Sequence, residues 1–307
     1  MRNMIPRSWR GDPDLQKMTE LILSLRANGQ MVYPIAADLF EELADPDVQV
    51  TARLWEDEGG RLVGFAYVNR YQNLVDAFVV EKFTPAIETE LIDWVVSAAR
   101  RRNREIGQSL TLAASALESD LSRLAFLERS GFEYQVESSI LMSRSLDQPI
   151  PDPQLPPGFI IRPMGGEAEI DAYVALHRAA FGTEIMTVEY RRTIISAPDY
   201  IPELDLVAVA PDGDLAAFCV CQIFPDDSPR AGGLKEGWTD PLGTHPAYQR
   251  LGLATALLLT GMRLLKARGM DTAILGTSSS NLAMQHTARS VGYQDASNTL
   301  WYSKSVD

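Results

Sequence analysis

The sequence is poor in the residues that would place it in several protein classes. It has only two cysteines and three histidines among 307 residues, so neither a disulfide framework nor a histidine-rich metal site is expected. No apolar run is long enough to cross a bilayer, and the first ten residues lack the apolar segment of a secretion signal. We therefore expect a cytoplasmic protein that binds no membrane and no metal ion.

Its charge is one-sided. The chain carries 28 basic and 41 acidic residues, a net charge of −13, whereas nucleic-acid binding needs a basic surface. The same balance favours a cationic small molecule, such as an amine, over a polyanionic partner. Cys219 and Cys221 stand two apart in a strand-like run, so we expect both on one face of a strand as ordinary packed residues.

One stretch lacks acidic residues altogether. No Asp or Glu occurs from position 241 to 270, and its basic residues are Arg250, Arg263, Lys266 and Arg268. Within it, the run Gln-Arg-Leu-Gly-Leu-Ala at 249–254 follows an extended segment, 237–244, and opens an apolar helix that reaches about 268. Backbone N–H groups at a helix start lack intrahelical partners and lie at the positive end of the dipole. The run therefore predicts a loop that binds phosphate oxygens.

This loop resembles the acetyl-CoA pyrophosphate loop, Q/R-x-x-G-x-G/A, of the GNAT superfamily of N-acetyltransferases. Pro246 lies three residues before Gln249, as in the family's longer V-x-P-x-x-Q/R-x-x-G run, although Thr244 replaces the valine. A short apolar strand at 272–275, a helix led by Asn281 and a Gly-Tyr pair at 292–293 follow in the family's order. The alternative is a Rossmann-like crossover, but no G-x-G-x-x-G or ribose-binding acid accompanies the loop.

The chain repeats itself. A strand, a Gly-containing turn and a return strand occur at 50–70 and again at 206–224, with Phe65 and Phe218 in matching places. Later, Phe132 follows a glycine as Tyr293 does. The offset between the halves grows from 153 to 161 residues, which predicts an insertion in the polar loop 226–235.

We therefore predict an α/β (mixed α+β) chain made of two tandem GNAT folds, each with a mixed, mostly antiparallel sheet flanked by helices. The expected domains are residues 1–146 and 158–307, joined by a linker at 147–157 that contains five prolines. This architecture resembles that of the mycothiol synthases.

The amino-terminal half lacks the phosphate loop. Its equivalent stretch, 81–88, contains no glycine, and Glu88 and Glu90 fall in the first turns of the following helix. Carboxylates there suit the helix dipole and would repel a pyrophosphate. We predict a degenerate domain that binds no acetyl-CoA and supports the other half.

In the carboxy-terminal half, the resemblance implies a binding path for acetyl-CoA. The backbone of Leu242, Gly243 and Thr244 would pair with the pantetheine amides, as an added strand pairs with a sheet edge. The loop would hold the pyrophosphate, and Asn281 would touch the pantetheine arm, cap its own helix, or do both. The loop residues concerned are Gln249, Arg250, Leu251, Gly252, Leu253, Ala254 and Thr255.

The expected reaction is direct attack of an amine on the thioester, which needs a base and a proton for the leaving thiolate. Asp240 is our first candidate for the base and Glu236 the second, because they stand four apart and share a face if the strand is regular. The alternative is that both are solvated strand residues.

The acid is less evident. Many GNAT enzymes carry a tyrosine four residues before the Gly of the Gly-Phe/Tyr pair, but that position is Ala288 here. His286 is about 200° away on the helix, so Tyr302 on the closing strand is the candidate that we name. Water can also protonate a thiolate whose thiol has a pKa of about 8.5.

The acceptor side is the least defined part of the sequence. The first helices of the second half, 167–197, would form one wall of the acceptor pocket. Tyr190, Arg191 and Arg192 either line that pocket or pack as ordinary helix residues, and His177 is expected to have no role.

The prediction for the whole chain is an N-acetyltransferase that transfers an acetyl group from acetyl-CoA to a small amine in a ternary complex. We expect a monomer or a weak homodimer. One alternative is a non-catalytic acyl-CoA-binding sensor or structural protein, and another is an acyltransferase that uses a longer acyl-CoA.

Overall fold

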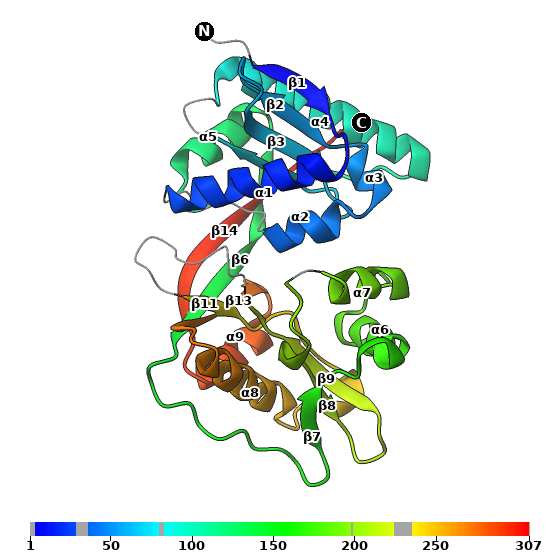
Figure 1. Cartoon of the computed structure of the whole chain (residues 1–307), viewed down its shortest axis with the longest axis vertical. Coiled ribbons are helices and arrows are strands. Elements are labelled where there is room, and N and C mark those ends of the chain that lie inside the picture. The colour runs from blue at the N-terminus through cyan, green and yellow to red at the C-terminus, as the bar shows by residue number, and fades with distance from the viewer. Residues whose placement is uncertain (1–3, 29–35, 80–82, 198, 224–234, 307) are drawn as a thin grey trace. The chain divides into compact units, whose positions relative to one another are not determined.

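The chain forms two compact units. A computed structural model describes residues 4–28, 36–79, 83–197, 199–223 and 235–306. Unit 1 consists of residues 1–139 together with 298–307, and unit 2 of residues 140–297. Both units combine helices with mixed or antiparallel sheets (Figure 1), which confirms the predicted fold class. The predicted insertion at 226–235 lies, apart from its last residue, outside the described residues.

Unit 1 contains the first five helices of the chain. Its elements are β1 (Ile5–Ser8), α1 (Asp12–Ala27), α2 (Ala36–Glu42), α3 (Pro46–Gln49), β2 (Arg53–Glu56), β3 (Leu62–Val68), β4 (Leu74–Phe78), α4 (Pro85–Ile106), β5 (Leu112–Leu117), α5 (Leu121–Arg129) and the first part of β6 (Glu133–Ser145). The helix predicted to carry Glu88 and Glu90 in its first turns is α4. Thr84 precedes Pro85 at its start, and Gly107 ends it in the left-handed conformation.

The sheet of unit 1 has a packed layer on each face. Its strand order is β1-β2-β3-β4, and every residue of β3 is buried. Because successive side chains of a strand point to opposite faces, Phe65 packs with the residues of α1 and α2, whereas Ala66 packs with those of α4. Figure 1 shows α1 and α4 on opposite sides of this sheet.

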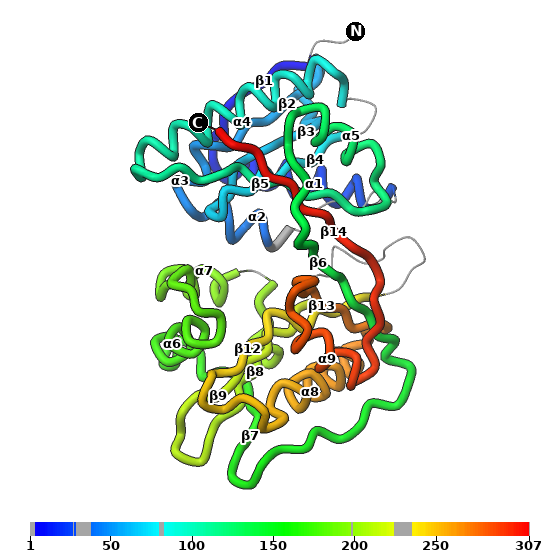
Figure 2. The backbone as a smooth tube through the Cα atoms, turned by 180° about the vertical axis from the view of Figure 1, so that it is seen from behind, coloured from blue at the N-terminus to red at the C-terminus, as the bar shows by residue number. Residues whose placement is uncertain are grey.

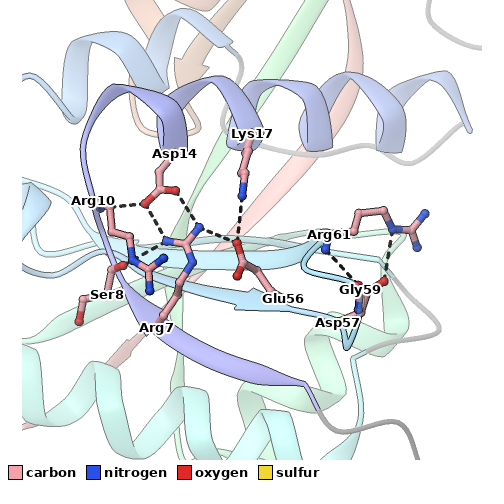
Figure 3. Close-up of polar contacts among 9 residues, drawn as sticks. All are labelled: Arg7, Ser8, Arg10, Asp14, Lys17, Glu56, Asp57, Gly59 and Arg61. Carbon is pink, nitrogen blue, oxygen red and sulfur yellow. Dashed lines mark hydrogen bonds and ion pairs between the residues drawn. The ribbon is translucent and has the colours of Figure 1, made fainter.

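An ion-pair network ties the first strand of unit 1 to its neighbours (Figure 3). The guanidinium of Arg7 donates to both carboxylate oxygens of Asp14, at 2.7 Å each, and to Glu56 at 2.7 Å. Lys17 also donates to Glu56, at 3.1 Å. The hydrogen bond from Arg7 lowers the pKa of Glu56 to about 2, and Lys17 adds to the effect. The network thus joins β1, α1 and β2 through charge-assisted bonds.

Unit 2 holds the remaining elements. After the second part of β6, these are β7 (Ile160–Pro163), α6 (Ile170–Phe181), α7 (Val188–Ile195), β8 (Asp205–Val209), β9 (Leu215–Val220), β10 (Gln222–Ile223), β11 (Glu236–Trp238), β12 (Leu242–Thr244), α8 (Leu253–Ala267), β13 (Thr272–Ser278), α9 (Leu282–Ser290) and the start of β14 (Gln294–Lys304). Short 3₁₀ turns occupy Gly166–Glu169, Pro202–Leu204 and Pro246–Tyr248.

The sheet of unit 2 also has two packed faces. Helix α8 covers one face, where Leu257 packs with Cys219 of β9, and α6 covers the other, where Tyr173 packs with Phe218 of the same strand. Figure 1 shows α6 and α7 on one side of β8 and β9, with α8 and α9 on the other. Both cysteines are buried free thiols with their sulfur atoms 3.7 Å apart. Cys219 lies in β9 as predicted, whereas Cys221 lies between β9 and β10.

Two strands pass from one unit to the other along the chain. Strand β6 leaves unit 1 after residue 139, and β14 enters unit 1 at residue 298. There, β14 pairs antiparallel with β5, with Tyr302 opposite Ala114. Figure 2 shows this carboxy-terminal segment in red. The predicted domain ranges follow the sequence repeat, whereas the compact units assign the final ten residues to unit 1.

No helix within the described ranges has both the length and the apolar character that crossing a bilayer requires.

Candidate functional site

The loop before α8 has the backbone conformation of an open anion cradle. Arg250 and Gly252 both adopt positive φ, 62° and 81°, and the helix begins at Leu253, which is buried. A Cβ atom on Gly252 would meet no atom within 4 Å, so the space in front of this glycine is free. Residues 249–252 are exposed. The loop therefore presents its backbone to solvent while Leu253 anchors it in the core.

The electrostatics of the loop favour an anion. The first turn of α8 contains no acidic residue, and the N–H groups of Leu253, Ala254 and Thr255 belong to that turn, where intrahelical acceptors are lacking. The helix dipole adds positive potential at the same point. These features agree with the predicted phosphate loop.

The other basic residues of this stretch lie elsewhere. Arg263, Lys266 and Arg268 belong to the last turns of α8 or follow it, about 16–24 Å along the axis from the loop. Arg263 forms an ion pair with Asp152, and Arg268 approaches Glu203 at 3.8 Å. Of the four basic residues in the acid-free stretch, Arg250 alone lies in the loop before α8. An anion bound at this loop could therefore contact Arg250 and the backbone N–H groups, but not the other three basic residues.

Strand β12 offers an open edge. It is the end strand of the sheet β12-β9-β8-β7, and Gly243 lies opposite Phe218 of β9. The bonds from the Val220 N–H to the Pro241 carbonyl and from the His245 N–H to the Ala216 carbonyl fix the pattern. By the alternation of antiparallel ladders, Gly243 then bonds to β9, while the N–H and C=O groups of its neighbours point outward.

The three residues predicted to pair with pantetheine differ in where their backbone groups point. Leu242 and Thr244 present backbone groups to the open side, where no other described strand pairs with them. Gly243 instead permits close packing, because a Cβ there would lie 2.5 Å from the Phe218 ring and 3.0 Å from Ala180 of α6. A glycine is required at this position for α6 to approach the sheet.

The predicted continuous strand 237–244 is broken. Residues 239–241 separate β11 from β12, and β11 pairs in parallel with β13 whereas β12 does not. The last backbone–backbone bond between the described parts of the diverging segments is from the Thr239 N–H to the Ile274 carbonyl, at 2.9 Å. Strands β12 and β13 therefore belong to different sheets, and the chain segments diverge after Thr239.

Asp240 stands at the point where the strands part. Its Oδ2 accepts a hydrogen bond from the Gly276 N–H of β13 at 3.2 Å. Its Oδ1 is out of contact with solvent and has no hydrogen-bond partner among the described residues. Burial raises the pKa of this carboxyl to about 7, against the opposing effect of the Gly276 bond. Such a carboxyl has both a free acceptor position and a pKa suited to proton transfer near neutrality.

Glu236 lies on the same side of the segment as Asp240. A Cβ on Gly237 would touch Leu265 of α8, and Thr239 contacts the hydroxyl of Tyr293 at 2.8 Å, so the odd-numbered residues face the α8–α9 side. Alternation then places Glu236, Trp238 and Asp240 on the opposite side. Glu236 and Asp240 therefore lie on the same side of the segment, as predicted, although the strand is interrupted after Trp238.

Helix α9 begins at a capping asparagine and buries one face against the core. Asn281 caps the helix through Oδ1, which accepts from the Met284 N–H at 3.1 Å, so its amide NH₂ remains the group that could reach a cofactor. Ala288 is fully buried in the core beside α8. Tyr293, named above only as part of the Gly-Tyr pair and the internal repeat, is buried with its hydroxyl bonded to Thr239. His286 is exposed, as expected.

Arg191, one of the residues named for the acceptor wall, lies in a cluster with Asp205 and two tyrosines. Arg191 is 1% exposed and ion-paired with Asp205 of β8, and its guanidinium lies 3.8 Å from the Tyr173 ring. The hydroxyl of Tyr200 donates to Asp205 at 2.6 Å. Arg192 instead points to Glu167 at the surface. Arg191 and Tyr200 therefore hold α7 against β8.

Tyr302, the named candidate for the acid, belongs to unit 1. It is 4% exposed and packs in the core beside α4 and β5, with its ring 5.7 Å from that of Tyr134. Trp301 donates to Ser139 in the same unit. Tyr302 follows unit 2 in the sequence, but β14 passes into unit 1 at residue 298, so the order of the sequence did not indicate this placement. The role of Tyr302 as the acid stays a prediction.

Unit 1 closes the equivalent opening with side chains of α5. Strands β4 and β5 approach at Asn73 and Ala113. Beyond that point Arg123 bonds both strands, with NH1 and NH2 donating to Asp76 at 2.8 and 2.7 Å and Nε donating to the Ser115 carbonyl at 2.6 Å. At the start of α4, Arg129 pairs with Glu88.

Comparisons with known proteins agree with this geometry. Residues 171–293 match the Acetyltransferase (GNAT) family. Among curated relatives, the mycothiol acetyltransferase of Kineococcus radiotolerans is 34% identical over 154 residues, 49% of this chain and 47% of that protein. The chain thus spans about half the length of the curated relatives that it matches first.

Solved structures extend the likeness to the whole chain. A GCN5-related N-acetyltransferase from Sphaerobacter thermophilus has a TM-score of 0.68 at 23% identity, covering 99% of this chain and 96% of its own. A tandem GNAT protein of the clavulanic acid biosynthesis pathway has a TM-score of 0.71 at 15% identity, covering 100% and 99%. These two likenesses concern the fold. Residues 171–293 thus match the GNAT family of acetyltransferases, and the fold of the whole chain is similar to that of tandem GNAT proteins.

Proposed function

We propose that the protein is an acetyl-CoA-dependent N-acetyltransferase of small amines, and that unit 2 carries both the cofactor and the chemistry. The observation that carries the proposal is the Asp240 carboxyl at the opening of the sheet, with one buried oxygen unpartnered among the described residues and a pKa raised to about 7. Two other features support a cofactor there, namely the outward backbone groups of β12 and the open loop before α8.

The residues present suit acetyl-CoA. Backbone N–H groups of Gln249 to Thr255, with Arg250, would hold the pyrophosphate, and the outward groups of Leu242 and Thr244 would pair with the pantetheine amides. The NH₂ group of Asn281 would reach the same arm. When bound, acetyl-CoA supplies an acyl group activated as a thioester. Gly243 stays with β9 and positions the edge.

Asp240 would then act as the base. In the reaction a bond forms between the amine nitrogen and the acyl carbon, the carbon–sulfur bond breaks, and the amine proton passes to Oδ1 of Asp240. The sulfur leaves as a thiolate and takes a proton from water, because Ala288 offers none. Glu236, on the same side of the segment, is the second candidate for the base or for holding a cationic amine.

The names of the relatives guide the choice of amine. The curated proteins that match are named mycothiol acetyltransferase, so amines related to mycothiol are the first acceptors to test. The second candidate function, acyl-CoA binding without turnover, is favoured by Ala288 at the position where many family members carry tyrosine.

The experiment is a screen of small amines with detection of free CoA thiol, repeated with Asp240→Asn. We expect the variant to retain acetyl-CoA binding and to lose about 10²–10⁴ in kcat, the range of a general base. The matched control is Asp271→Asn, an aspartate of unit 2 that accepts from the Lys235 N–H away from the opening. Binding with no turnover on any amine would favour the non-catalytic alternative, and full activity of Asp240→Asn would remove Asp240 as the base.

A further inference from the structure

His177 lies in an aromatic cluster beside the strand that we assign to the cofactor. It belongs to α6, and its ring stacks on Phe218 with centroids 5.5 Å apart and planes 19° apart. The ring centroid of Phe181 lies 4.7 Å away and that of Tyr173 6.2 Å away. The cluster reaches the surface, because Phe181 is 45% exposed.

The position of His177 relative to β12 follows from two contacts. Phe218 is the register partner of Gly243, and Ala180, three residues after His177 on α6, lies 3.0 Å from where a Cβ of Gly243 would be. Residues three apart on a helix share a face. His177 therefore sits over the β9–β12 pair, one helical turn from the contact with the edge strand.

The two ring nitrogens of His177 have different surroundings. Nδ1 is buried and has no hydrogen-bond partner among the described residues, whereas the side chain as a whole is half-buried. Burial, helped by the charge of Arg191, lowers the pKa of His177 to about 4, so the ring is neutral near pH 7. A neutral imidazole keeps one proton, and its free energy is lower when the protonated nitrogen is the one that can donate to a partner or to water. We assign the proton to Nε2.

Resting on the proposed function, we infer that the Nε2–H of His177 donates a hydrogen bond to a carbonyl or hydroxyl oxygen of a substrate bound along β12. The oxygen belongs either to the thioester of the acyl-CoA or to the acyl acceptor. His177 does not act as the base in this role. A ring whose pKa is about 4 is protonated only below that pH, and it is too weak a base to accept a proton from the amine. It recognises a group and helps to fix its position.

Because the chain has only three histidines, the ring can be observed directly. Protein labelled with ¹⁵N at histidine gives three sets of imidazole signals, and the set missing from His177→Phe belongs to His177. We expect that set to show a proton on Nε2 and to titrate near pH 4. A proton on Nδ1 would overturn the assignment.

Ligands then distinguish the two sources of the oxygen. A shift of the His177 signals with acetyl-CoA, but not with free CoA, supports the thioester carbonyl. A shift with free CoA plus an amine from the screen, but not with free CoA alone, supports the acceptor. Unmoved His177 signals in all three mixtures, while calorimetry shows the cofactor bound, would overturn the inference alone. Failure of acetyl-CoA to bind would overturn the proposed function and the inference with it.

Two substitutions separate recognition from packing. His177→Phe keeps the ring contacts and removes the donor, and His177→Gln restores an N–H without the ring. We expect His177→Phe to retain the melting temperature and to raise the KM of the recognised substrate about tenfold, the effect of one neutral hydrogen bond. His177→Gln should recover part of that loss. A lower melting temperature with unchanged KM in His177→Phe would mean that the ring serves packing only.

Discussion

The two units treat the same opening in opposite ways. In unit 1, Arg123 of α5 bridges the diverging strands through Asp76 and the Ser115 carbonyl, and the opening is filled by an ion pair. In unit 2, one hydrogen bond between Asp240 and Gly276 spans the opening, and Oδ1 of Asp240 has no partner within the described part of the chain. We propose that this difference separates a unit that binds no cofactor, whose diverging strands are bonded internally, from a unit that binds it.

The helix starts differ in the same sense. Helix α4 carries Glu88 in its first turn, and Arg129 of α5 pairs with it. Helix α8 has no acid in its first turn and is preceded by Gly252 at positive φ with open space before it. In unit 1 a carboxylate of the protein lies at the positive end of the helix dipole. In unit 2 the first turn of α8 has no carboxylate, and we propose that the pyrophosphate binds there.

The largest effect is expected from Gly252→Glu. A side chain at φ 81° strains the loop, and its carboxylate places a negative charge where the pyrophosphate should bind. We expect acetyl-CoA affinity to fall at least 100-fold, measured by calorimetry. Gly269→Glu is a matched control at the other end of α8, because that glycine also has positive φ, 82°, and open space. Equal losses in the two variants would show that strain, not charge, is responsible.

The pH dependence of the rate is the second test. A carboxyl acts as a base only when ionised, so a group whose pKa is raised to about 7 gains this ability as the pH rises through 7. We expect kcat/KM to rise about tenfold per pH unit below 7 and to level off above it. A profile already flat from pH 5 upward would mean that Asp240 is ionised throughout and that burial does not control it.

The third test concerns the ion pair of unit 1. In Arg123→Ala the nearly buried carboxylate of Asp76, 4% exposed, would lose its partner, at a cost of about 3 kcal/mol in the free energy of unfolding. Arg123→Met combined with Asp76→Leu should recover most of that loss in a denaturant titration. Acetyl-CoA stoichiometry should not change in either variant. A second binding site in Arg123→Ala would show that the arginine alone keeps unit 1 closed.

The smallest effect is expected from Arg129→Ala. The side chain of Arg129 is 59% exposed, and exposed ion pairs contribute about 0–1 kcal/mol. Its melting curve should be almost that of the parent protein. A loss as large as that of Arg123→Ala would contradict the view that the opening, rather than the helix start, is the important contact of α5.

Much of the difference between the two units could be predicted from local sequence patterns. The glycine in the loop before α8 and its absence before α4 were visible in the sequence, as were the repeated hairpins. The break at residues 239–241 was missed, although Pro241 follows Asp240 there and proline is rare inside a paired strand. The pairing of β11 with β13 and of β12 with β9 shows that the two segments are separate strands. The placement of Tyr302 and Trp301 in unit 1 was hidden, since it depends on where β14 pairs.

The contacts of single side chains were the least predictable. Arg123 lies on a short helix with no motif around it, and its importance arises from reaching Asp76, 47 residues away. His177 was expected to have no role, because an amphipathic helix pattern does not reveal a stack on Phe218 of another element. Long-range pairs of this kind are set by packing, which composition and periodicity do not encode.

The most direct test of the account is a calorimetric titration of the whole protein with acetyl-CoA. The account predicts one binding site per chain, because unit 2 has an open loop before α8 and outward backbone groups on β12. In the described part of unit 1, Arg123 bridges the strands at the equivalent place and Glu88 lies in the first turn of α4. Two sites per chain would contradict the claim that unit 1 is closed, and no binding by folded protein would contradict the assignment of unit 2.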